Sequence, residues 1–276
     1  MIPRWCATLA GAGLVFGSLM AVTGAGAAHA ATTAHPGVTH IRPGGVVNGF
    51  VPGGVMSHPA GAAAQEHGRR NGDESSNWSG YAVTGSDGAF NSVSSSWTEP
   101  TATCNDSGTE YAAFWVGLDG FNSDSVEQTG TDSDCDGGSP DYYGWYEMYP
   151  AAPVYFDNAV SPGDSMSASV SVSGDTYTIT LTDNSQGWTQ TENETESGLA
   201  DSSAEVITEA PSDSDGPLPL ADFGTVNYSG STVNGSSMGG QSPTSITMVG
   251  SSGDQLDSTS GMDGSGDFSN TWMAES

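Results

Sequence analysis

The sequence predicts an all-β protein, an antiparallel β-sandwich that follows an amino-terminal region of different character. From residue 77 onward, short runs alternate between apolar and polar residues and are separated by Gly, Ser, Asn and Asp. About a dozen such runs fall within about 200 residues, and none repeats with the period of a helix. The first 70 residues show no such alternation. One β domain is therefore expected, at residues 73–276.

Residues 1–30 are typical of a secretory signal peptide. Arg4 precedes an apolar and small-residue run from Ala7 to Val22, and Ala28-His29-Ala30 fits a small-x-small cleavage site. The apolar run is too short to span a bilayer, although a membrane anchor is the alternative interpretation. We expect a secreted, extracellular protein that does not associate with membranes.

Residues 31–72 form a second segment, rich in Gly, Pro, Ala and His, which contains Arg69-Arg70. Such a composition buries little apolar surface, so we expect it to be largely disordered unless it folds against another surface. All four basic residues and all five histidines lie at or before position 70, whereas 32 of the 33 acidic residues follow it. This separation of charge predicts a pro-segment that inhibits its own acidic domain; an unprocessed linker is the alternative.

The absence of Lys, Arg and His after residue 70 excludes several kinds of chemistry. Without His there is no Ser-His-Asp triad, Cys-His pair or His-bound zinc. Without Lys or Arg there is no Schiff base, and nucleic-acid binding is disfavoured because phosphate contacts need cations. Carboxylates, amides, hydroxyls and two cysteines remain available for catalysis.

The formal net charge of −29 predicts a protein adapted to acid. Carboxylates repel one another near neutral pH and lose that repulsion around pH 4, where they become protonated. The same charge favours a monomer. Solubility alone is another explanation for it.

Cys104 and Cys135 are expected to form a disulfide, since Cys6 lies in the signal peptide and an oxidising compartment favours pairing. A free reactive thiol is disfavoured because no cation is available to lower its pKa. The Asp-rich run from Asp132 to Gly137 could be a calcium loop, but it lacks the twelve-residue spacing with a terminal Glu. We expect no metal and no cofactor.

Ser173-Gly174-Asp175 marks the clearest hairpin turn of the chain. Pro211–Pro219 and Gly250–Gly266 are expected to be loops. The predicted strands are Trp78–Thr84, Ser92–Thr98, Tyr111–Gly117, Ser125–Thr131, Tyr142–Tyr149, Ser165–Ser173, the run containing Tyr177, Ile179 and Leu181, Gly187–Glu192, Ser203–Glu209, Ala221–Tyr228, Ser245–Val249 and Asp267–Met273.

The stretch from Tyr111 to Pro150 carries the strongest functional signal. Its last run places Tyr143, Trp145, Glu147 and Tyr149 on one strand face. A charge among aromatic residues is unusual for a half-buried strand and is typical of a cleft wall. In the first run, Trp115 and Asp119 are an even number of residues apart, so a strand would place them on the same face. The same holds for Val126 and Gln128 in the middle run.

Three motifs in this order resemble the glutamic peptidases, a family of secreted, acid-active endopeptidases. They are Asn77-Trp78-Ser79-Gly80-Tyr81, the strand reading Gln-Thr-Gly from Gln128, and a strand reading Ala-Glu, three residues, Glu that ends at Glu209. The resemblance covers roughly residues 77–272 and implies two antiparallel sheets in a concanavalin A-like jelly roll. The cysteine spacing is similar to that of bacterial members. Tyr143 departs from the fungal pattern, which has Asp at that position.

The resemblance implies catalysis by Gln128 and Glu209. Glu209 would act as general base and then general acid, and the Gln128 carboxamide would donate to the oxyanion. Protein or peptide substrates and insensitivity to pepstatin follow from the family. Trp78, Trp97, Trp188 and Trp272 are expected to be packing residues. Residues expected to bind substrate or to position the catalytic pair are Trp115, Asp119, Asp132, Trp145, Glu147 and Tyr149.

The sequence also leaves other hydrolase and binding functions open. A pepsin-like mechanism needs two Asp-Thr/Ser-Gly signatures in apolar strands, and the domain offers only Asp106-Ser107-Gly108 in a polar loop. A jelly-roll glycoside hydrolase could use Glu147 and Glu209 as its carboxyl pair. A carbohydrate-binding module is the third alternative. Substitution of Gln128 by Ala would separate the peptidase from the sugar hydrolase, because only the peptidase needs that carboxamide.

Overall fold

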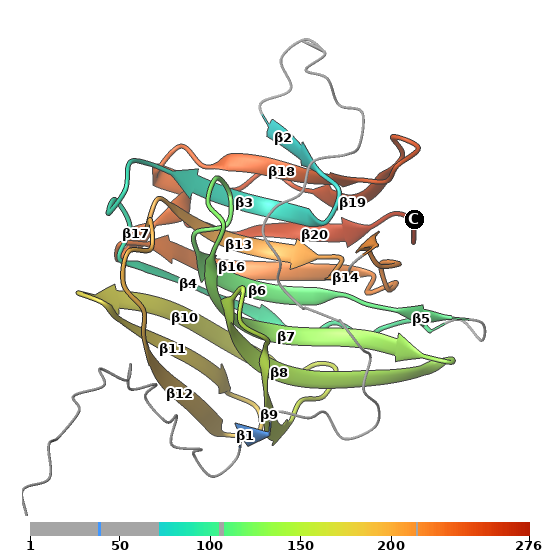
Figure 1. The fold of residues 1–276 in the computed structure, drawn as a ribbon. Helices are drawn as coiled ribbons and strands as arrows, with labels where there is room; N and C mark the ends of the chain where they lie inside the picture. Colours follow the sequence, from blue (N-terminus) through green and yellow to red (C-terminus); the bar gives the residue numbers. More distant parts are fainter. Residues whose placement is uncertain (1–37, 40–71, 105–107, 214) are drawn as a thin grey trace, which may run out of the picture. The chain divides into compact units, whose positions relative to one another are not determined.

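The computed structural model describes residues 38–39, 72–104, 108–213 and 215–276. The proposed signal peptide, nearly all of the proposed pro-segment and Arg69-Arg70 lie outside these residues. The described chain consists of β-strands and loops, with one short 3₁₀ turn, η1 (Met238–Gly240) (Figure 1). The predicted all-β class is therefore confirmed.

The first layer of the sandwich contains seven strands in antiparallel order. In space they run from β9 through β8, β7, β6, β13 and β3 to β18. Their bounds are β9 (Val154–Ala159), β8 (Ser139–Tyr149), β7 (Val126–Asp136), β6 (Ala113–Leu118), β13 (Ser203–Glu209), β3 (Trp78–Thr84) and β18 (Thr244–Val249).

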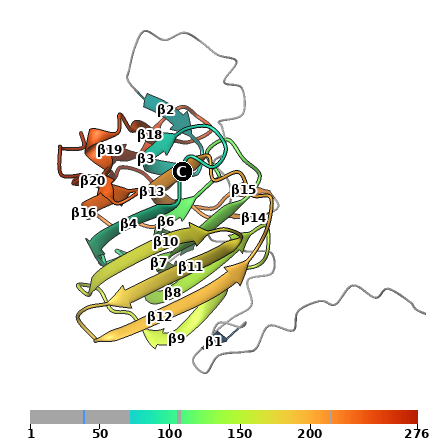
Figure 2. The ribbon, with the colours of Figure 1, turned by 90° about the vertical axis from the view of Figure 1, so that its left-hand side faces the viewer.

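The second layer continues from the first, because β18 also pairs with β19. From there the order is β19, β20, β16, β4, β10, β11 and β12. Their bounds are β19 (Gln255–Thr259), β20 (Phe268–Trp272), β16 (Thr225–Val233), β4 (Ser92–Thr98), β10 (Ser165–Ser173), β11 (Thr176–Asp183) and β12 (Trp188–Thr195). Strands β10 and β11 contact β7, and β4 contacts β6. The second set of strands therefore packs on the first, and the two sets form the two layers of the sandwich (Figure 2).

Short strands complete the sheet. β2 is parallel to β18, β5 extends the β7 edge, β17 pairs with β16, and β1 pairs with β9; β14 and β15 form a separate small hairpin. Their bounds are β1 (Val38–Thr39), β2 (Gly72–Ser75), β5 (Thr109–Glu110), β14 (Ser212–Asp213), β15 (Gly216–Pro217) and β17 (Ser236–Ser237).

The main core lies between the two layers and follows from period-two alternation. In β10, Met166, Ala168 and Val170 are buried while the intervening serines are less so, and Ile179 and Leu181 alternate in the same way in β11. The first layer contributes its own buried residues to this core from β6 and β13. Its opposite face carries a second buried cluster, which includes Trp78, Trp115, Trp145 and Ile207. Strands buried on both faces explain why β6 and β13 contain almost no exposed position.

Several strand predictions need correction. The interval Gly250–Gly266, expected to be a loop, contains β19, whose buried Leu256 and Asp257 are held between β18 and β20. The Pro211–Pro219 interval, also expected to be a loop, contains the β14–β15 hairpin. Strand β9 was missed, and the Asp-rich run from Asp132 is not a loop, because β7 continues through Asp136. In β19 and in the end of β7, pairing with neighbouring strands outweighs a composition typical of turns.

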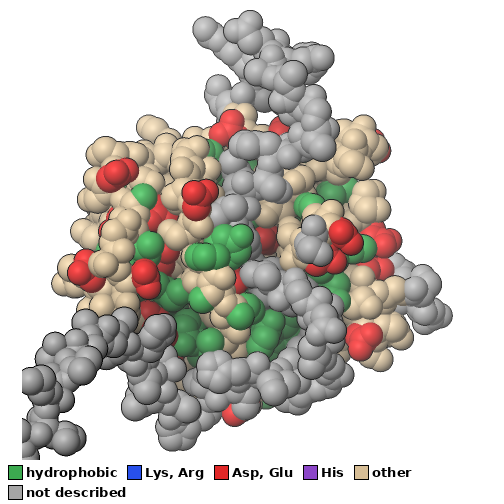
Figure 3. All heavy atoms as spheres, in the orientation of Figure 1, with side chains coloured by type: hydrophobic (Ala, Val, Ile, Leu, Met, Phe, Trp, Pro, Cys, Tyr) green, Lys and Arg blue, Asp and Glu red, His purple; other side chains and the backbone are tan. Residues whose placement is uncertain are grey.

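Cys104 and Cys135 form the predicted disulfide, with their Cα atoms 5.3 Å apart. The bond ties the segment before β5 to β7. Among the described residues, no helix is long and apolar enough to cross a membrane. On the face shown in Figure 3, carboxylate side chains are spread over the described surface and no Lys or Arg appears among the described residues.

Candidate active site

The predicted site residues lie on the first layer, on the face opposite the main core. Residues directly opposite one another in adjacent antiparallel strands point to the same face, so the register of β13, β6, β7 and β8 defines three parallel rows of side chains. The rows are Glu205, Gly117, Gln128, Glu147; Ile207, Trp115, Gly130, Trp145; and Glu209, Ala113, Asp132, Tyr143.

Glycine in the first two of these rows makes room for large neighbours. A Cβ at Gly117 would lie 2.9 Å from the Trp115 ring and 3.1 Å from the Gln128 Cβ. A Cβ at Gly130 would overlap the Phe114 carbonyl oxygen and lie 2.6 Å from the Trp115 Cβ. The two glycines therefore leave the space that the Trp115 side chain occupies beside β6 and β7.

Gln128 is buried and bonded to a carboxyl group. Its Nε2 donates to Oε2 of Glu147, the residue paired with it on β8, at 2.9 Å. This contact joins two of the predicted residues and fixes the plane of the carboxamide.

Glu209, also buried, receives hydrogen bonds on both carboxylate oxygens. Nε1 of Trp115 donates to Oε2 at 2.9 Å, and Nδ2 of Asn77 donates to Oε1 at 3.2 Å. Trp115 in turn packs edge to face on Trp78, with 4.9 Å between the ring centroids. Glu209 is therefore held by the two strands that flank β13, with Trp115 coming from β6 and Asn77 from the start of β3.

The electrostatics of the site follow from burial. Burial raises the pKa of Glu209 well above its usual range, and the donors Trp115 and Asn77 oppose that shift. Burial, followed by the charge of Glu209, raises the pKa of Glu147 well above its usual range, and the Gln128 N–H opposes that shift. Glu147 and Glu209 are thus electrostatically coupled, and two negative charges on this pair are disfavoured.

Asp132 lies at the far end of the same face. It accepts hydrogen bonds from Nε1 of Trp145 and from the hydroxyl of Tyr143, both at 2.7 Å. The Tyr143 hydroxyl also contacts Asp134 at 2.6 Å. The tyrosine that departs from the family pattern therefore contacts the carboxylate that orients Trp145. Tyr149, at the end of β8, is half-buried and packs at the edge of the second hydrophobic cluster.

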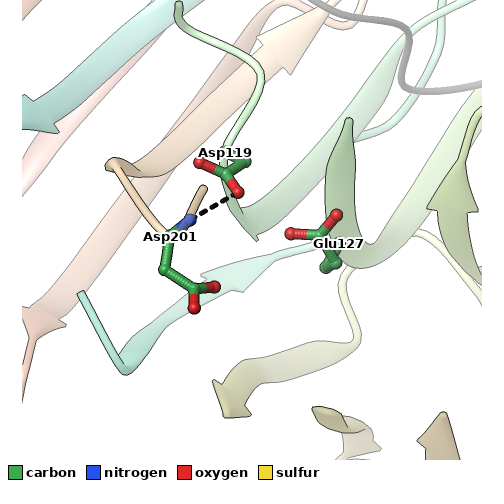
Figure 4. Close-up of side chains that lie close together, drawn as sticks. All are labelled: Asp119, Glu127 and Asp201. Atoms are coloured by element: carbon green, nitrogen blue, oxygen red, sulfur yellow. Dashed lines mark hydrogen bonds between the residues drawn. The ribbon is translucent and has the colours of Figure 1, made fainter. Parts of the chain in front are cut away.

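Asp119 is placed apart from Gln128 and Glu209. It has a positive φ of 68° just after the end of β6. The strand alternation that predicted Asp119 on the same face as Trp115 therefore ends before Asp119. Its carboxylate accepts the backbone N–H groups of Asp201 and Ser202 at 2.7 and 2.8 Å. Asp119 thus fixes the loop that leads into β13, and with it Asp201 and Glu127 (Figure 4) form a carboxylate cluster that could hold a cation.

The sequence interpretation missed two residues of the site. Asn77 bonds Glu209 directly, and Trp78, expected to be a packing residue only, supports Trp115 and also lowers the pKa of Glu209. Both belong to the first motif, Asn77-Trp78-Ser79-Gly80-Tyr81. That motif was the available signal, since its register places Trp78 opposite Glu209.

The fold and the site define the class of protein: a β-sandwich in which a carboxamide and two coupled carboxyl groups meet on one face, with tryptophans as neighbours. Residues 76–272 match the model of the Peptidase A4 family. The chain therefore belongs to this family of glutamic peptidases, and it is a peptidase whose substrates are proteins or peptides.

Known relatives agree with this assignment. Aspergillopepsin-2 of Aspergillus niger is 31% identical over 219 residues, which cover 70% of this chain and 77% of the relative. Scytalido-glutamic peptidase, solved with a transition-state analogue inhibitor, superposes with a TM-score of 0.62 and 27% identity over 72% of this chain and 98% of that one. Aspergilloglutamic peptidase of Aspergillus niger gives a TM-score of 0.54 and 29% identity, covering 59% of this chain and 99% of that one.

Proposed function

We propose that this chain is a secreted acid endopeptidase in which Glu209 and Gln128 hydrolyse the peptide bond with an activated water. Glu209 takes a proton from the water and later gives it to the leaving amine. The Gln128 carboxamide donates to the oxygen of the tetrahedral intermediate.

The observation that carries this proposal is that Gln128 and Glu209 both act on Glu147. Gln128 donates a hydrogen bond to the Glu147 carboxyl group, and the charge of Glu209 raises the pKa of that same group. This common neighbour supports a joint role for two residues whose strands are separated by β6.

The hydrogen bonds also divide the roles between the two carboxyl groups. Glu209 accepts from Trp115 and Asn77, and each donor favours its ionised form. Glu147 accepts a hydrogen bond from Gln128 on Oε2, Oε1 has no hydrogen-bond partner within the described chain, and the charge of Glu209 disfavours the ionised form of Glu147. Glu209 is therefore the first of the pair to ionise and serves as the base. Glu147 remains protonated and acts by orienting Gln128.

Burial sets the pH range of the mechanism. The raised pKa of Glu209 keeps a proton available for the leaving amine in acid. Water that enters with the substrate solvates the carboxylate and lowers this pKa, which provides the ionised form for the first step.

The experiment compares cleavage of an unfolded protein at about pH 3.5, with pepstatin present, by the wild type, Glu209→Gln and Gln128→Ala. We expect the wild type to cut, Glu209→Gln to be inactive, and Gln128→Ala to lose about 10²- to 10³-fold in rate. Glu99→Gln is the matched control, because Glu99 is a buried carboxyl with a pKa of about 7 that is already protonated at this pH. Full activity of Glu209→Gln, in samples with wild-type circular dichroism, would refute the assignment.

The same experiment tests the sugar-hydrolase alternative. A glycoside hydrolase based on Glu147 and Glu209 would retain activity on polysaccharide after Gln128→Ala. Membership of a peptidase family favours loss of proteolysis instead.

Maturation is part of the proposal. Residues 1–30 direct secretion, residues 31–72 are the inhibitory pro-segment, and acid triggers self-cleavage near Arg69-Arg70 by neutralising the carboxylates that hold the cationic segment. The mature enzyme is an extracellular monomer. Mass spectrometry of the chain beginning at residue 31 should show the shortened form after acid incubation; an intact chain would contradict self-processing.

A further inference from the structure

Asp119, Glu127 and Asp201 form a carboxylate cluster outside the proposed catalytic pair. They come from the end of β6, the start of β7 and the loop before β13 (Figure 4). One carboxylate oxygen from each residue lies within 4.8 Å of the others. Asp119 accepts two backbone N–H groups, and Asp201 accepts the hydroxyl of Tyr177 at 2.7 Å. Two of the three carboxylates are therefore held in place by donors that leave lone pairs free.

Glu127 supplies an independent observation. Its side chain is completely buried, and neither carboxylate oxygen has a hydrogen-bond partner within the described chain. In Figure 4 the carboxylate points toward the space between Asp119 and Asp201. A buried polar group without a partner is destabilising, and more so when it is charged.

The domain itself offers no positive charge to offset this cluster. No Lys, Arg or His occurs after residue 70. A bound cation would satisfy the Glu127 oxygens and neutralise three carboxylates at once, as carboxylate ligands do in protein calcium sites.

We propose that Asp119, Glu127 and Asp201 bind one Ca²⁺ ion. The ligands are oxygen atoms only, which selects hard cations. Oxygens that all lie within 4.8 Å of one another can share one Ca²⁺ ion at Ca²⁺–oxygen distances of about 2.3–2.6 Å. Ca²⁺ is favoured over Mg²⁺ because it accepts six to eight oxygens in irregular geometry, whereas Mg²⁺ demands a nearly ideal octahedron. Three carboxylates offer up to six oxygens, and water at the half-exposed Asp201 completes the coordination.

The site has a structural consequence for the catalytic strands. Glu127 immediately precedes Gln128, Asp119 follows the strand that carries Trp115, and the loop of Asp201 leads into the strand that carries Glu209. Calcium would therefore fasten the ends of β6, β7 and β13 to one another, and through Tyr177 to the second layer. The measurable effect is on thermal stability, independent of whether the peptidase mechanism is correct.

The test uses the full chain, stripped of metal with a chelating resin and held near pH 7, because protons compete with metal for the same oxygens. Calorimetric titration with CaCl₂ should give about one site per chain. Ca²⁺ at about one hundred times its dissociation constant should raise the melting temperature by at least about 5 °C. An equal concentration of MgCl₂ should raise it less.

Variants separate this site from the general attraction of Ca²⁺ to an acidic protein. Glu127→Gln and Asp201→Asn should lose the Ca²⁺-dependent shift, whereas Glu99→Gln, which removes a buried carboxyl elsewhere, should retain it. Asp201→Asn decides the matter if Glu127→Gln fails to fold. The proposal is overturned if Ca²⁺ leaves the wild-type melting temperature unchanged, or if the variants shift as much as the wild type. In either case Glu127 holds a proton, not a metal.

Discussion

Glu99 gives the clearest link between this structure and the dependence of stability on pH. It follows β4, is buried, and accepts hydrogen bonds from Thr131, Ser133 and Trp97. Burial is the largest influence on its pKa and raises it from 4.5 to about 7, although the three donors oppose the shift. We therefore predict that Glu99→Gln reduces the loss of stability that the wild type suffers on neutralisation.

The sign and size follow from proton linkage. The folded-state pKa of Glu99 is higher than the unfolded one, so the folded protein binds more protons between the two values. The resulting stabilisation is complete below about pH 4.5, falls as the pH rises, and is absent above about pH 7. A rise from 4.5 to about 7 corresponds to about 3 kcal/mol, at about 1.4 kcal/mol per pKa unit.

The assay is urea unfolding of the wild type and Glu99→Gln at pH 4, 5.5 and 7.5. Gln has the shape of the protonated acid, so the two proteins should have similar stability at pH 4. The wild type should lose about 3 kcal/mol more than the variant by pH 7.5, while other buried carboxyls act equally in both and cancel. Parallel stability curves for the two proteins would refute the reasoning.

Three further predictions concern the sheet and the site. Trp115→Phe removes the indole donor to Glu209, so the rising limb of the kcat/KM profile should shift to higher pH by about one unit; an unshifted limb would contradict this. Gly130→Ala places a Cβ against backbone atoms of β6. We expect the free energy of unfolding, measured by denaturant titration, to fall by about 3 kcal/mol. Unchanged stability would show that β6 and β7 can move apart at little cost. Replacing Cys104 and Cys135 together by Ser should lower the free energy of unfolding by about 3 to 4 kcal/mol, because the disulfide closes a loop with a sequence separation of 31. A decrease below about 1 kcal/mol would argue that loop closure in the unfolded chain is not the origin of the stabilisation.

Local pattern was sufficient to predict much of the fold. The intervals Trp78–Thr84, Ser92–Thr98, Ser165–Ser173 and Ser203–Glu209 coincide with β3, β4, β10 and β13. They carry alternating or continuous apolar residues that are bounded by turn residues. β19 was missed because its residues resemble those of the Gly-rich loop around it, and only pairing with β18 and β20 makes it a strand.

Sequence pattern indicates candidate site residues one strand at a time and does not show how the strands pair. Gln128 and Glu147 belong to separate runs of the sequence, and only the register of β7 against β8 places them opposite each other. The contact of Asn77 with Glu209 joins residues 132 positions apart, and no local pattern indicates it. The displacement of Asp119 from the face that carries Gln128 and Glu209 depends on a positive φ that alternation alone does not reveal.

The sequence by itself determined the all-β class, the large excess of carboxylates, the disulfide and the absence of histidine and lysine after residue 70. These properties depend on composition and on neighbours within a few residues, which a linear pattern records. Tertiary structure alone decided which carboxyl groups are buried, which donors they receive and which of them are coupled. Those relations arise because strands distant in sequence pair side by side, and burial between two layers changes the pKa of groups whose reference values in water are nearly identical.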